Sequence, residues 1–195
     1  EISDLERKSV QSKVLSGQIW NLQMIDEGLL ISGDGGAKYK VDGTLKTVSE
    51  VRSSWKFLDV GNKGEYFVLG TYSGMYLYEH SDDIQAPLTL LGKLAGFEES
   101  TRIFEEDSEG YIWVSHAYRG LFRLKPDYEN LEFSEIRKFG KSEGLPDDFY
   151  ITVSKIRGEL VFATEKGVFE FDKSQERFVP QKELTELLGT NKNVQ

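Results

Sequence analysis

One short pattern recurs four times along the chain and strongly limits the folds that it can adopt. Each copy has a turn glycine, an apolar stretch, a small or polar residue, a second glycine and a further apolar stretch. Successive copies are 38, 46 and 47 residues apart, measured between the second glycines, which are Gly36, Gly74, Gly120 and Gly167. A period of about 40–50 residues with several short strands is typical of β-propeller blades.

Each copy extends into four predicted strands that are rich in β-branched and aromatic residues and are separated by Gly, Asp, Asn and Ser. Glycine suits the hairpin turns because it tolerates a positive φ. The expected fold class is therefore all-β: a β-propeller of about four blades, each with four antiparallel strands. The predicted strands cover residues 19–25, 29–32, 37–41 and 45–49; 55–60, 66–70, 75–79 and 88–94; 102–107, 111–115, 121–124 and 133–139; and 151–156, 160–164, 168–171 and 177–180.

The repeats divide the chain into blades over roughly residues 17–50, 51–96, 97–140 and 145–182. Residues 183–189 predict a short helical turn, and residues 183–195 as a whole are interpreted as the lead-in to a further blade. We therefore expect the whole chain, residues 1–195, to be a fragment of a larger propeller. An open arc of blades exposes apolar strands at both ends. We expect either closure of the four blades on themselves or a homo-oligomer formed through the exposed blade faces.

Composition and motifs exclude several classes of function. The chain has 24 Lys and Arg against 33 Asp and Glu, a net charge of −9, and an acidic surface repels the phosphates of nucleic acid. No apolar run approaches the roughly 20 residues of a membrane span. The chain has no Cys, which excludes disulfides and thiol catalysis, and its two histidines, His80 and His116, fit no zinc spacing. We predict no catalytic residue, metal or cofactor.

Two stretches that resemble functional motifs are better interpreted as turns. Residues 32–40, SGDGGAKYK, lack the spacing of a phosphate-binding loop, so a hairpin turn at residues 34–36 is favoured. Residues 107–110 combine acids with a glycine, but the remaining ligands of a calcium loop are absent. Glu105 and Glu106 are adjacent on a predicted strand, where neighbouring side chains point to opposite faces, so they form no acid/base pair.

The stretch EDSEGYIWVSHAYRGLFRL, with GKSEGLPDDFYITVSKI further on, resembles the two-component regulator propeller repeat of bacterial sensor proteins. The resemblance is strong in the third blade and at the GLP junction, fair in the second and fourth blades, and weak in the first. It covers about residues 17–180, and in the fourth blade Phe162 replaces the strand tryptophan. The matching residues are the acidic turn residue Asp107, the strand aromatic Trp113, the pair Gly120-Leu121, and Gly144-Leu145-Pro146.

This resemblance implies a non-enzymatic sensor or ligand-binding propeller that serves signal transduction or transcription regulation. Such propellers belong to hybrid histidine kinases or helix-turn-helix regulators, whose other domains would be partners, and several of them respond to polysaccharide fragments. It implies a periplasmic or extracytoplasmic location, and a cytoplasmic location stays open. Two alternatives stay open as well: a fragment of a polysaccharide-acting propeller enzyme, either a lyase or a glycosidase, and a protein-interaction scaffold.

The first strand of each blade lines the central channel of a propeller, and ligands favour the mouth of that channel. The starts of the four first strands carry Trp20, Trp55, Arg102 and Thr152. Two indoles and a guanidinium suit a sugar or a uronic acid, because the aromatic faces stack and arginine binds a carboxylate through two hydrogen bonds. The alternative is that both tryptophans plug the channel or pack between blades.

Two further candidates lie at the end of a second strand and in the turn that follows it. His116 and Arg119 are expected on a rim, and His116 occupies the position that Thr71 and Thr164 hold in neighbouring blades. A structural, hydrogen-bonded role is the alternative for this histidine. Trp113, in the middle of an apolar strand, is predicted to be structural.

Overall fold

The computed structural model describes residues 17–61 and 64–188. Sixteen strands form four antiparallel sheets of four strands, in chain order within each sheet. The predicted all-β fold with four blade-like units is confirmed, and the strand ends differ from the predicted ones by at most three residues. The strands are β1 Ile19–Ile25, β2 Gly28–Gly33, β3 Gly36–Val41, β4 Thr44–Ser49, β5 Lys56–Val60, β6 Tyr66–Thr71, β7 Gly74–His80, β8 Leu88–Leu94, β9 Ile103–Glu106, β10 Ile112–His116, β11 Gly120–Asp127, β12 Glu132–Phe139, β13 Thr152–Ile156, β14 Glu159–Thr164, β15 Gly167–Asp172 and β16 Arg177–Pro180.

Short turns between the second and third strands explain the glycine of each repeat. The first residue of each third strand has a positive φ, between 98° and 125°. Glycine adopts this region without the steric cost that a Cβ atom imposes. The predicted hairpin turns at residues 34–36 and 107–110 are confirmed. The glycines concerned are Gly36, Gly74, Gly120 and Gly167.

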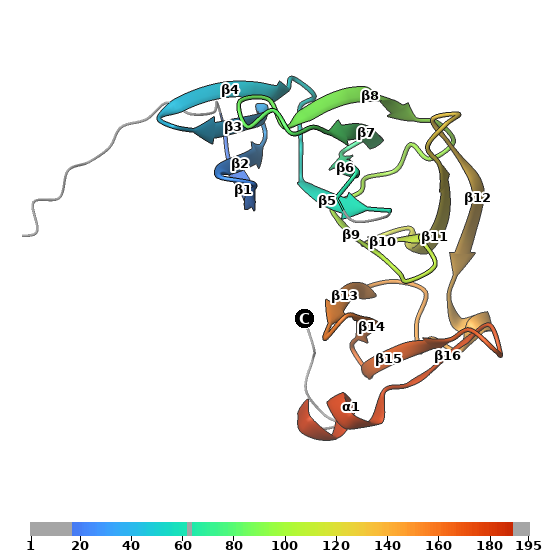
Figure 1. The fold of residues 1–195 in the computed structure, drawn as a ribbon. Helices are drawn as coiled ribbons and strands as arrows, with labels where there is room; N and C mark the ends of the chain where they lie inside the picture. Colours follow the sequence, from blue (N-terminus) through green and yellow to red (C-terminus); the bar gives the residue numbers. More distant parts are fainter. Residues whose placement is uncertain (1–16, 62–63, 189–195) are drawn as a thin grey trace, which may run out of the picture.

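The four sheets follow one another along an arc (Figure 1). The first sheet, β1–β4, and the fourth sheet, β13–β16, lie at its two ends, with the second sheet, β5–β8, and the third sheet, β9–β12, between them. The first strand of each sheet lies on the concave side of the arc and the last strand lies on the convex side. Trp20, Trp55, Arg102 and Thr152 lie on or next to these first strands, so their backbone belongs to the concave side.

Apolar clusters join each sheet to the next one. Leu30 of the first sheet packs with Leu69 of the second, Leu77 of the second sheet packs in a cluster with Val114 of the third, and Trp113 of the third packs with Phe162 of the fourth. Within the described residues three such clusters connect four sheets, and no cluster joins the fourth sheet to the first. Closure of the four blades on themselves, one of the two expected alternatives, is therefore not what this structure shows.

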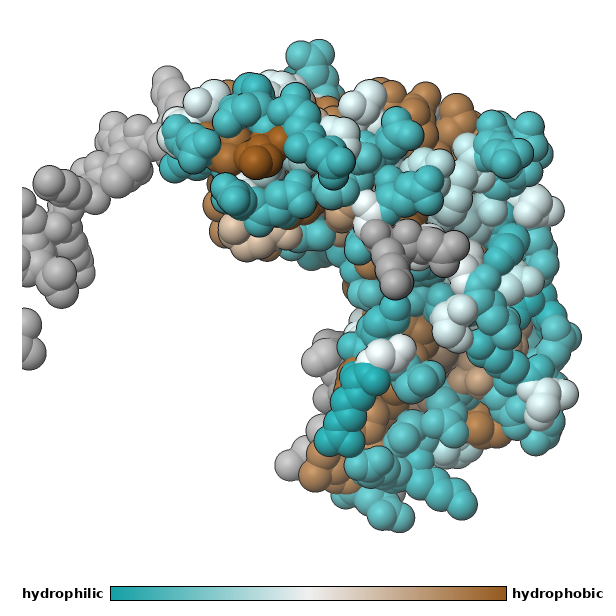
Figure 2. Space-filling view, viewed as in Figure 1, coloured by the Kyte–Doolittle hydropathy of each residue, from teal (hydrophilic) through white to brown (hydrophobic). Residues whose placement is uncertain are grey.

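Within the described residues, the first sheet leaves an apolar face uncovered at its end of the arc. Leu22 and Met24 are 59% and 65% exposed, and Leu22 lies opposite Ile31 in the ladder. On the second sheet Phe57 lies opposite Leu69 in the same way, but it is only 2% exposed because it packs in the cluster between the first two sheets. Figure 2 shows apolar surface over the first sheet, surrounded by hydrophilic side chains.

The fourth sheet is followed by the helix α1, Lys182–Leu188, which confirms the predicted helical turn. The helix packs against β15, and the Thr185 hydroxyl donates a hydrogen bond to the carbonyl oxygen of Gln181 at 2.6 Å. The interpretation of residues 183–195 as the lead-in to a further blade stays a prediction, and its first six residues belong to this helix. The rest of that lead-in, and residues 1–16 of the predicted propeller fragment, lie outside the described residues.

Glu106 on β9 introduces a pH dependence into the stability of the fold. Burial raises the pKa of its carboxyl above the ordinary value, although the Gly61 N–H donates a hydrogen bond to Oε1 at 2.9 Å, which acts in the opposite direction. Because the folded chain favours the protonated form, ionisation of Glu106 lowers the free energy of unfolding as the pH rises from the unfolded pKa through the folded one.

We therefore expect Glu106→Gln to become more stable relative to the wild type as the pH rises from about 4 to about 7. The glutamine amide oxygen still accepts the Gly61 hydrogen bond, so the substitution removes mainly the charge. Urea unfolding at several pH values measures the difference, with the exposed Glu132→Gln as the control. A difference that stays constant with pH would contradict this assignment.

Candidate functional site

The structure brings three of the predicted ligand-binding residues into one row. Trp20 lies on β1, Trp55 immediately precedes β5, and Arg102 immediately precedes β9. The indole rings of Trp20 and Trp55 are stacked, with centroids 4.0 Å apart and an interplanar angle of 25°. The guanidinium carbon of Arg102 lies 5.1 Å from the centroid of the Trp55 ring. The row therefore runs across the starts of three successive first strands, as the repeat predicted.

Backbone and side-chain hydrogen bonds position this row. The backbone N–H of Trp55 donates to the Gly70 carbonyl at 2.8 Å, and the indole N–H of Trp20 donates to Gln18 Oε1 at 3.3 Å. Both indoles are half-buried, whereas Arg102 is exposed. The tryptophans thus pack against each other across two sheets, while the guanidinium remains open to solvent beside an aromatic ring.

Thr152 completes the predicted set of first-strand residues. It is the first residue of β13 and is half-buried. Among the described residues, no hydrogen bond or ring contact connects Thr152 to the row of tryptophans and Arg102. The structure therefore brings together three members of this set and leaves the fourth separate.

His116 ends β10 and closes the turn that leads into β11. Its Nδ1 accepts hydrogen bonds from the backbone N–H groups of Tyr118 and Arg119, both at 3.2 Å. The hydroxyl oxygen of Thr71 accepts an N–H bond from Ser73 at 3.2 Å in the corresponding turn of the second sheet. His116 thus makes the structural turn contact that a threonine makes elsewhere.

The other ring nitrogen of His116 and the guanidinium of Arg119 face one acid. His116 Nε2 and Arg119 Nε lie 3.8 Å and 3.7 Å from the same oxygen of Glu99. Since Nδ1 accepts hydrogen bonds, the neutral ring carries its proton on Nε2. His116 and Arg119, the two candidates expected on a rim, therefore lie together, and their polar groups contact the turn backbone and Glu99.

Sequence analysis did not identify Arg123, an arginine held among aromatic rings. Its guanidinium carbon lies 4.4 Å from the ring centroid of Tyr111, and the side chain is buried. Nη2 also lies 3.2 Å from Glu135 Oε1. Three further aromatic centroids lie 5.4–5.7 Å from this carbon, those of Trp113, Phe139 and Phe171. One signal for this contact was available, because Arg123 pairs with Trp113 in the hairpin of β10 and β11. This pairing puts both side chains on one face of the sheet.

Replacement of Arg123 by alanine should lower the free energy of unfolding by about 2–3 kcal/mol, since a buried cation–π contact and a long apolar stem are lost together. Urea unfolding measures the change. Glu135 is half exposed, so the carboxylate that loses its partner can be hydrated. Arg119→Ala is the matched control, and equal losses in the two variants would show that the aromatic rings contribute nothing.

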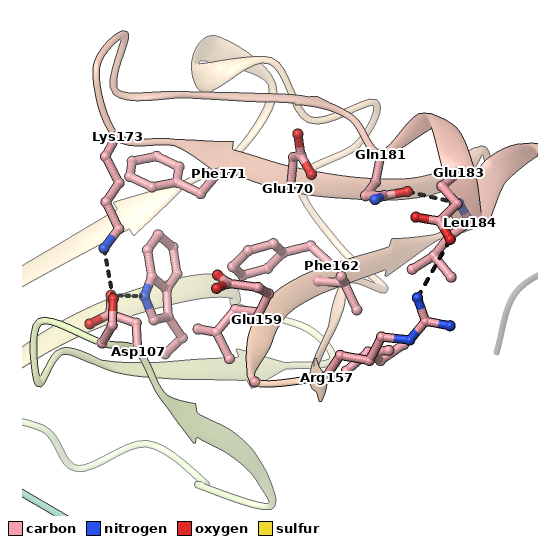
Figure 3. Close-up of a pocket in the computed structure, with 16 residues that line it drawn as sticks. Asp107, Arg157, Glu159, Phe162, Glu170, Phe171, Lys173, Gln181, Glu183 and Leu184 are labelled. Carbon is pink, nitrogen blue, oxygen red and sulfur yellow. Dashed lines mark hydrogen bonds and ion pairs between the residues drawn. The ribbon is translucent and has the colours of Figure 1, made fainter.

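A pocket of about 480 Å³ opens in the fourth sheet between β14 and β15 (Figure 3). These two strands are paired only from Phe162–Phe169 to Thr164–Gly167, three pairs, whereas β6 and β7 form six pairs. Further along, β14 continues to pair with β13, and β15 continues to pair with β16. The two halves of the sheet therefore separate, and the pocket occupies the place of the missing ladder.

Long-range contacts lie at both edges of the pocket. Lys173, after β15, lies 3.1 Å from the Ser108 hydroxyl and 3.2 Å from a carboxylate oxygen of Glu109, so the β15–β16 turn is tied to the third sheet. On the other side of the pocket, Arg157 lies 3.5 Å from Glu183 of α1. These contacts join residues that are far apart in sequence, which is why the repeat pattern could not predict the pocket.

Most charged groups around the pocket already have partners. Lys173 and Arg157 are paired as described, and the Asp107 carboxylate accepts bonds from the Trp113 indole N–H at 2.8 Å and from backbone N–H groups. By contrast, Glu159 and Glu170 have no ion pair or side-chain hydrogen bond to any residue in the described part of the chain. The described part of the chain contains no cluster of three or more metal-ligating side chains.

Comparisons with known proteins identify no relative: no protein-family model matches the chain, and no curated protein matches it. In the part of the chain that the structure describes, no helix has the length and apolar character needed to cross a membrane.

Proposed function

We propose that this chain is a non-enzymatic ligand-binding propeller of a bacterial sensor or regulator, and that it recognises an acidic carbohydrate through Trp20, Trp55 and Arg102. The observation that carries the proposal is the row itself: two stacked indoles with an exposed guanidinium 5.1 Å from one of them. Aromatic faces favour the apolar face of a sugar ring, and a guanidinium favours a carboxylate.

The concave position of the row supports the same function. Ligand sites in propellers lie on the inner strands or at the channel mouth, where several blades contribute side chains. Trp20, Trp55 and Arg102 come from three consecutive sheets, so that a ligand bound there would contact three blades at once. The assignment to a signalling or transcription-regulatory protein, with a periplasmic or extracytoplasmic location, follows only from the repeat resemblance and belongs to the proposal.

Binding of a uronic-acid oligosaccharide and of a neutral oligosaccharide of equal length tests this site by isothermal titration calorimetry. We expect the acidic sugar to bind more tightly, and Arg102→Gln to weaken it about tenfold while leaving the neutral sugar little changed. Trp20→Ala should weaken both sugars. Arg177→Gln, an exposed arginine on β16, is the control. Wild-type affinity in the Arg102 and Trp20 variants would place the ligand elsewhere, and loss in Arg119→Gln alone would place it on the rim.

We also propose that the uncovered face of the first sheet mediates association with a second copy of the chain. Its exposed Leu22 and Met24 lie on the face that, in the other sheets, packs against a preceding sheet. Light scattering after size exclusion should show an oligomer at about 100 μM that Leu22→Asp with Met24→Asp converts to a monomer, since two charges cannot be buried without partners. Leu187→Asp, on α1, is the control. A wild-type monomer at every concentration would contradict this.

A further inference from the structure

We propose that the pocket between β14 and β15 binds a small organic cation, with its apolar body against aromatic side chains and its ammonium group between Glu159 and Glu170. This site lies in the fourth sheet and includes none of the residues of the Trp20–Trp55–Arg102 row. The inference is therefore independent of the proposed carbohydrate function.

Aromatic and aliphatic side chains form one side of the pocket (Figure 3). Trp113, Phe162 and Phe171 line it together with Leu160. The Trp113 centroid lies 5.0 Å from that of Phe162 and 5.1 Å from that of Phe171, so the rings form one continuous apolar surface. A volume of about 480 Å³ is within the range of small-molecule sites, and apolar lining with a few polar groups is their usual composition.

The sign of the ligand charge follows from the groups that remain unpaired. Arg157 is paired with Glu183, and Lys173 is paired with Glu109. The uncommitted charges in the lining, among the residues that the structure describes, are the carboxylates of Glu159 and Glu170. These two residues lie on opposite sides of the pocket, one on β14 and one on β15. Two carboxylates that line one pocket favour a cation and disfavour an anion.

The interrupted ladder supplies further acceptors. The ladder between β14 and β15 ends at the pair Phe162–Phe169, and beyond it Leu160 and Phe171 line the pocket. These two residues form no ladder pair with each other among the described strands. Their carbonyl oxygens can accept N–H bonds from an ammonium group, which a carboxylate ligand cannot donate.

The aromatic cluster next to the pocket already holds one cation of the protein itself. The guanidinium carbon of Arg123 lies 5.7 Å from the ring centroids of both Trp113 and Phe171, which also line the pocket. An aromatic ring attracts a cation at each of its two faces. The rings therefore suit a second cation on the pocket side.

Trp113 provides a local readout for the test. The chain has three tryptophans, so Trp20→Phe with Trp55→Phe leaves Trp113 as the only indole and also removes both indoles of the proposed carbohydrate site. Fluorescence titration of this variant compares phenethylamine, the neutral isostere 2-phenylethanol and the anion phenylacetate. We expect saturable binding of phenethylamine, about tenfold weaker binding of the alcohol, and none of phenylacetate.

Substitution of the two acids then tests the pocket directly. We expect Glu159→Gln with Glu170→Gln to weaken phenethylamine binding at least about tenfold and Glu186→Gln, on α1, to leave it unchanged. Equal binding of the amine and the alcohol, an unaffected double variant, or no saturable signal up to about 10 mM would overturn the proposal. The acidic oligosaccharide is also titrated into Glu159→Gln with Glu170→Gln, with all three tryptophans present. Its binding reports on the carbohydrate site alone, so that failure of the cation proposal and failure of the carbohydrate proposal can be told apart.

Discussion

Replacement of Trp113 by alanine should lower the free energy of unfolding by about 3–5 kcal/mol, the cost of emptying a large buried aromatic site. The indole is 1% exposed and lies between the third and fourth sheets. Its ring centroid is 5.1 Å from Phe139, 5.0 Å from Phe162 and 5.1 Å from Phe171, so its removal deprives three rings of contacts. This burial agrees with the structural role that was predicted for Trp113.

Urea unfolding of Trp113→Ala and Trp113→Phe separates the two parts of this stabilisation. The indole N–H donates to Asp107 at 2.8 Å, and phenylalanine removes this bond while keeping most of the apolar volume. We expect a loss of about 1–2 kcal/mol for phenylalanine. A loss below about 1 kcal/mol for alanine would mean that the two sheets pack together without this side chain.

Gly74→Ala should lower the free energy of unfolding by about 2–4 kcal/mol. Gly74 has φ +105°, and a Cβ atom at this position would lie 2.5 Å from the carbonyl oxygen of Phe97. That oxygen belongs to the backbone that leads from the second sheet to the third, and the Phe97 side chain is part of their shared cluster. The clash therefore cannot be relieved by turning a flexible side chain.

Gly43→Ala is the matched control for this prediction. Gly43 also has a positive φ, +76°, but a Cβ atom there would meet no heavy atom within 4 Å. We expect Gly43→Ala to lower the free energy of unfolding by only about 1 kcal/mol, because alanine is strained at a positive φ but meets no clash. Thermal or urea unfolding of both variants measures the two losses of stability. Equal losses would show that the close approach of the Phe97 carbonyl oxygen to Gly74 is unimportant.

The same close approach recurs along the chain. A Cβ atom on Gly36 would lie 2.3 Å from the Ser49 carbonyl oxygen, and one on Gly120 would lie 2.6 Å from that of Asp148. Ser49 ends β4, and Asp148 lies between β12 and β13, so each oxygen lies at or after the end of its sheet. At Gly36, Gly74 and Gly120 the glycine thus serves both its own turn and a close approach of the backbone, whereas a Cβ atom on Gly167 would meet only the Thr185 side chain at 3.7 Å. Only the turn is visible in sequence.

Much of the candidate row was predictable because propeller repeats place equivalent positions side by side. Trp20, Trp55 and Arg102 occupy the starts of successive first strands, and the repeat period alone indicated that they would be neighbours. The pocket in the fourth sheet was not predictable. It arises where the ladder between β14 and β15 ends early, and ion pairs such as Lys173 with Glu109, 64 residues apart in sequence, join its edge to another sheet.

The amino-acid sequence by itself determined the strands and turns, because alternating apolar residues and glycines at positive φ act over a few neighbouring residues. Only the tertiary structure decided that the four sheets form an open arc with three apolar clusters, that Arg123 lies among aromatic rings, and that Glu159 and Glu170 line one pocket. These features depend on which faces of different sheets meet. Strand periodicity specifies that a face is apolar, but the partner of that face is chosen by packing between distant segments.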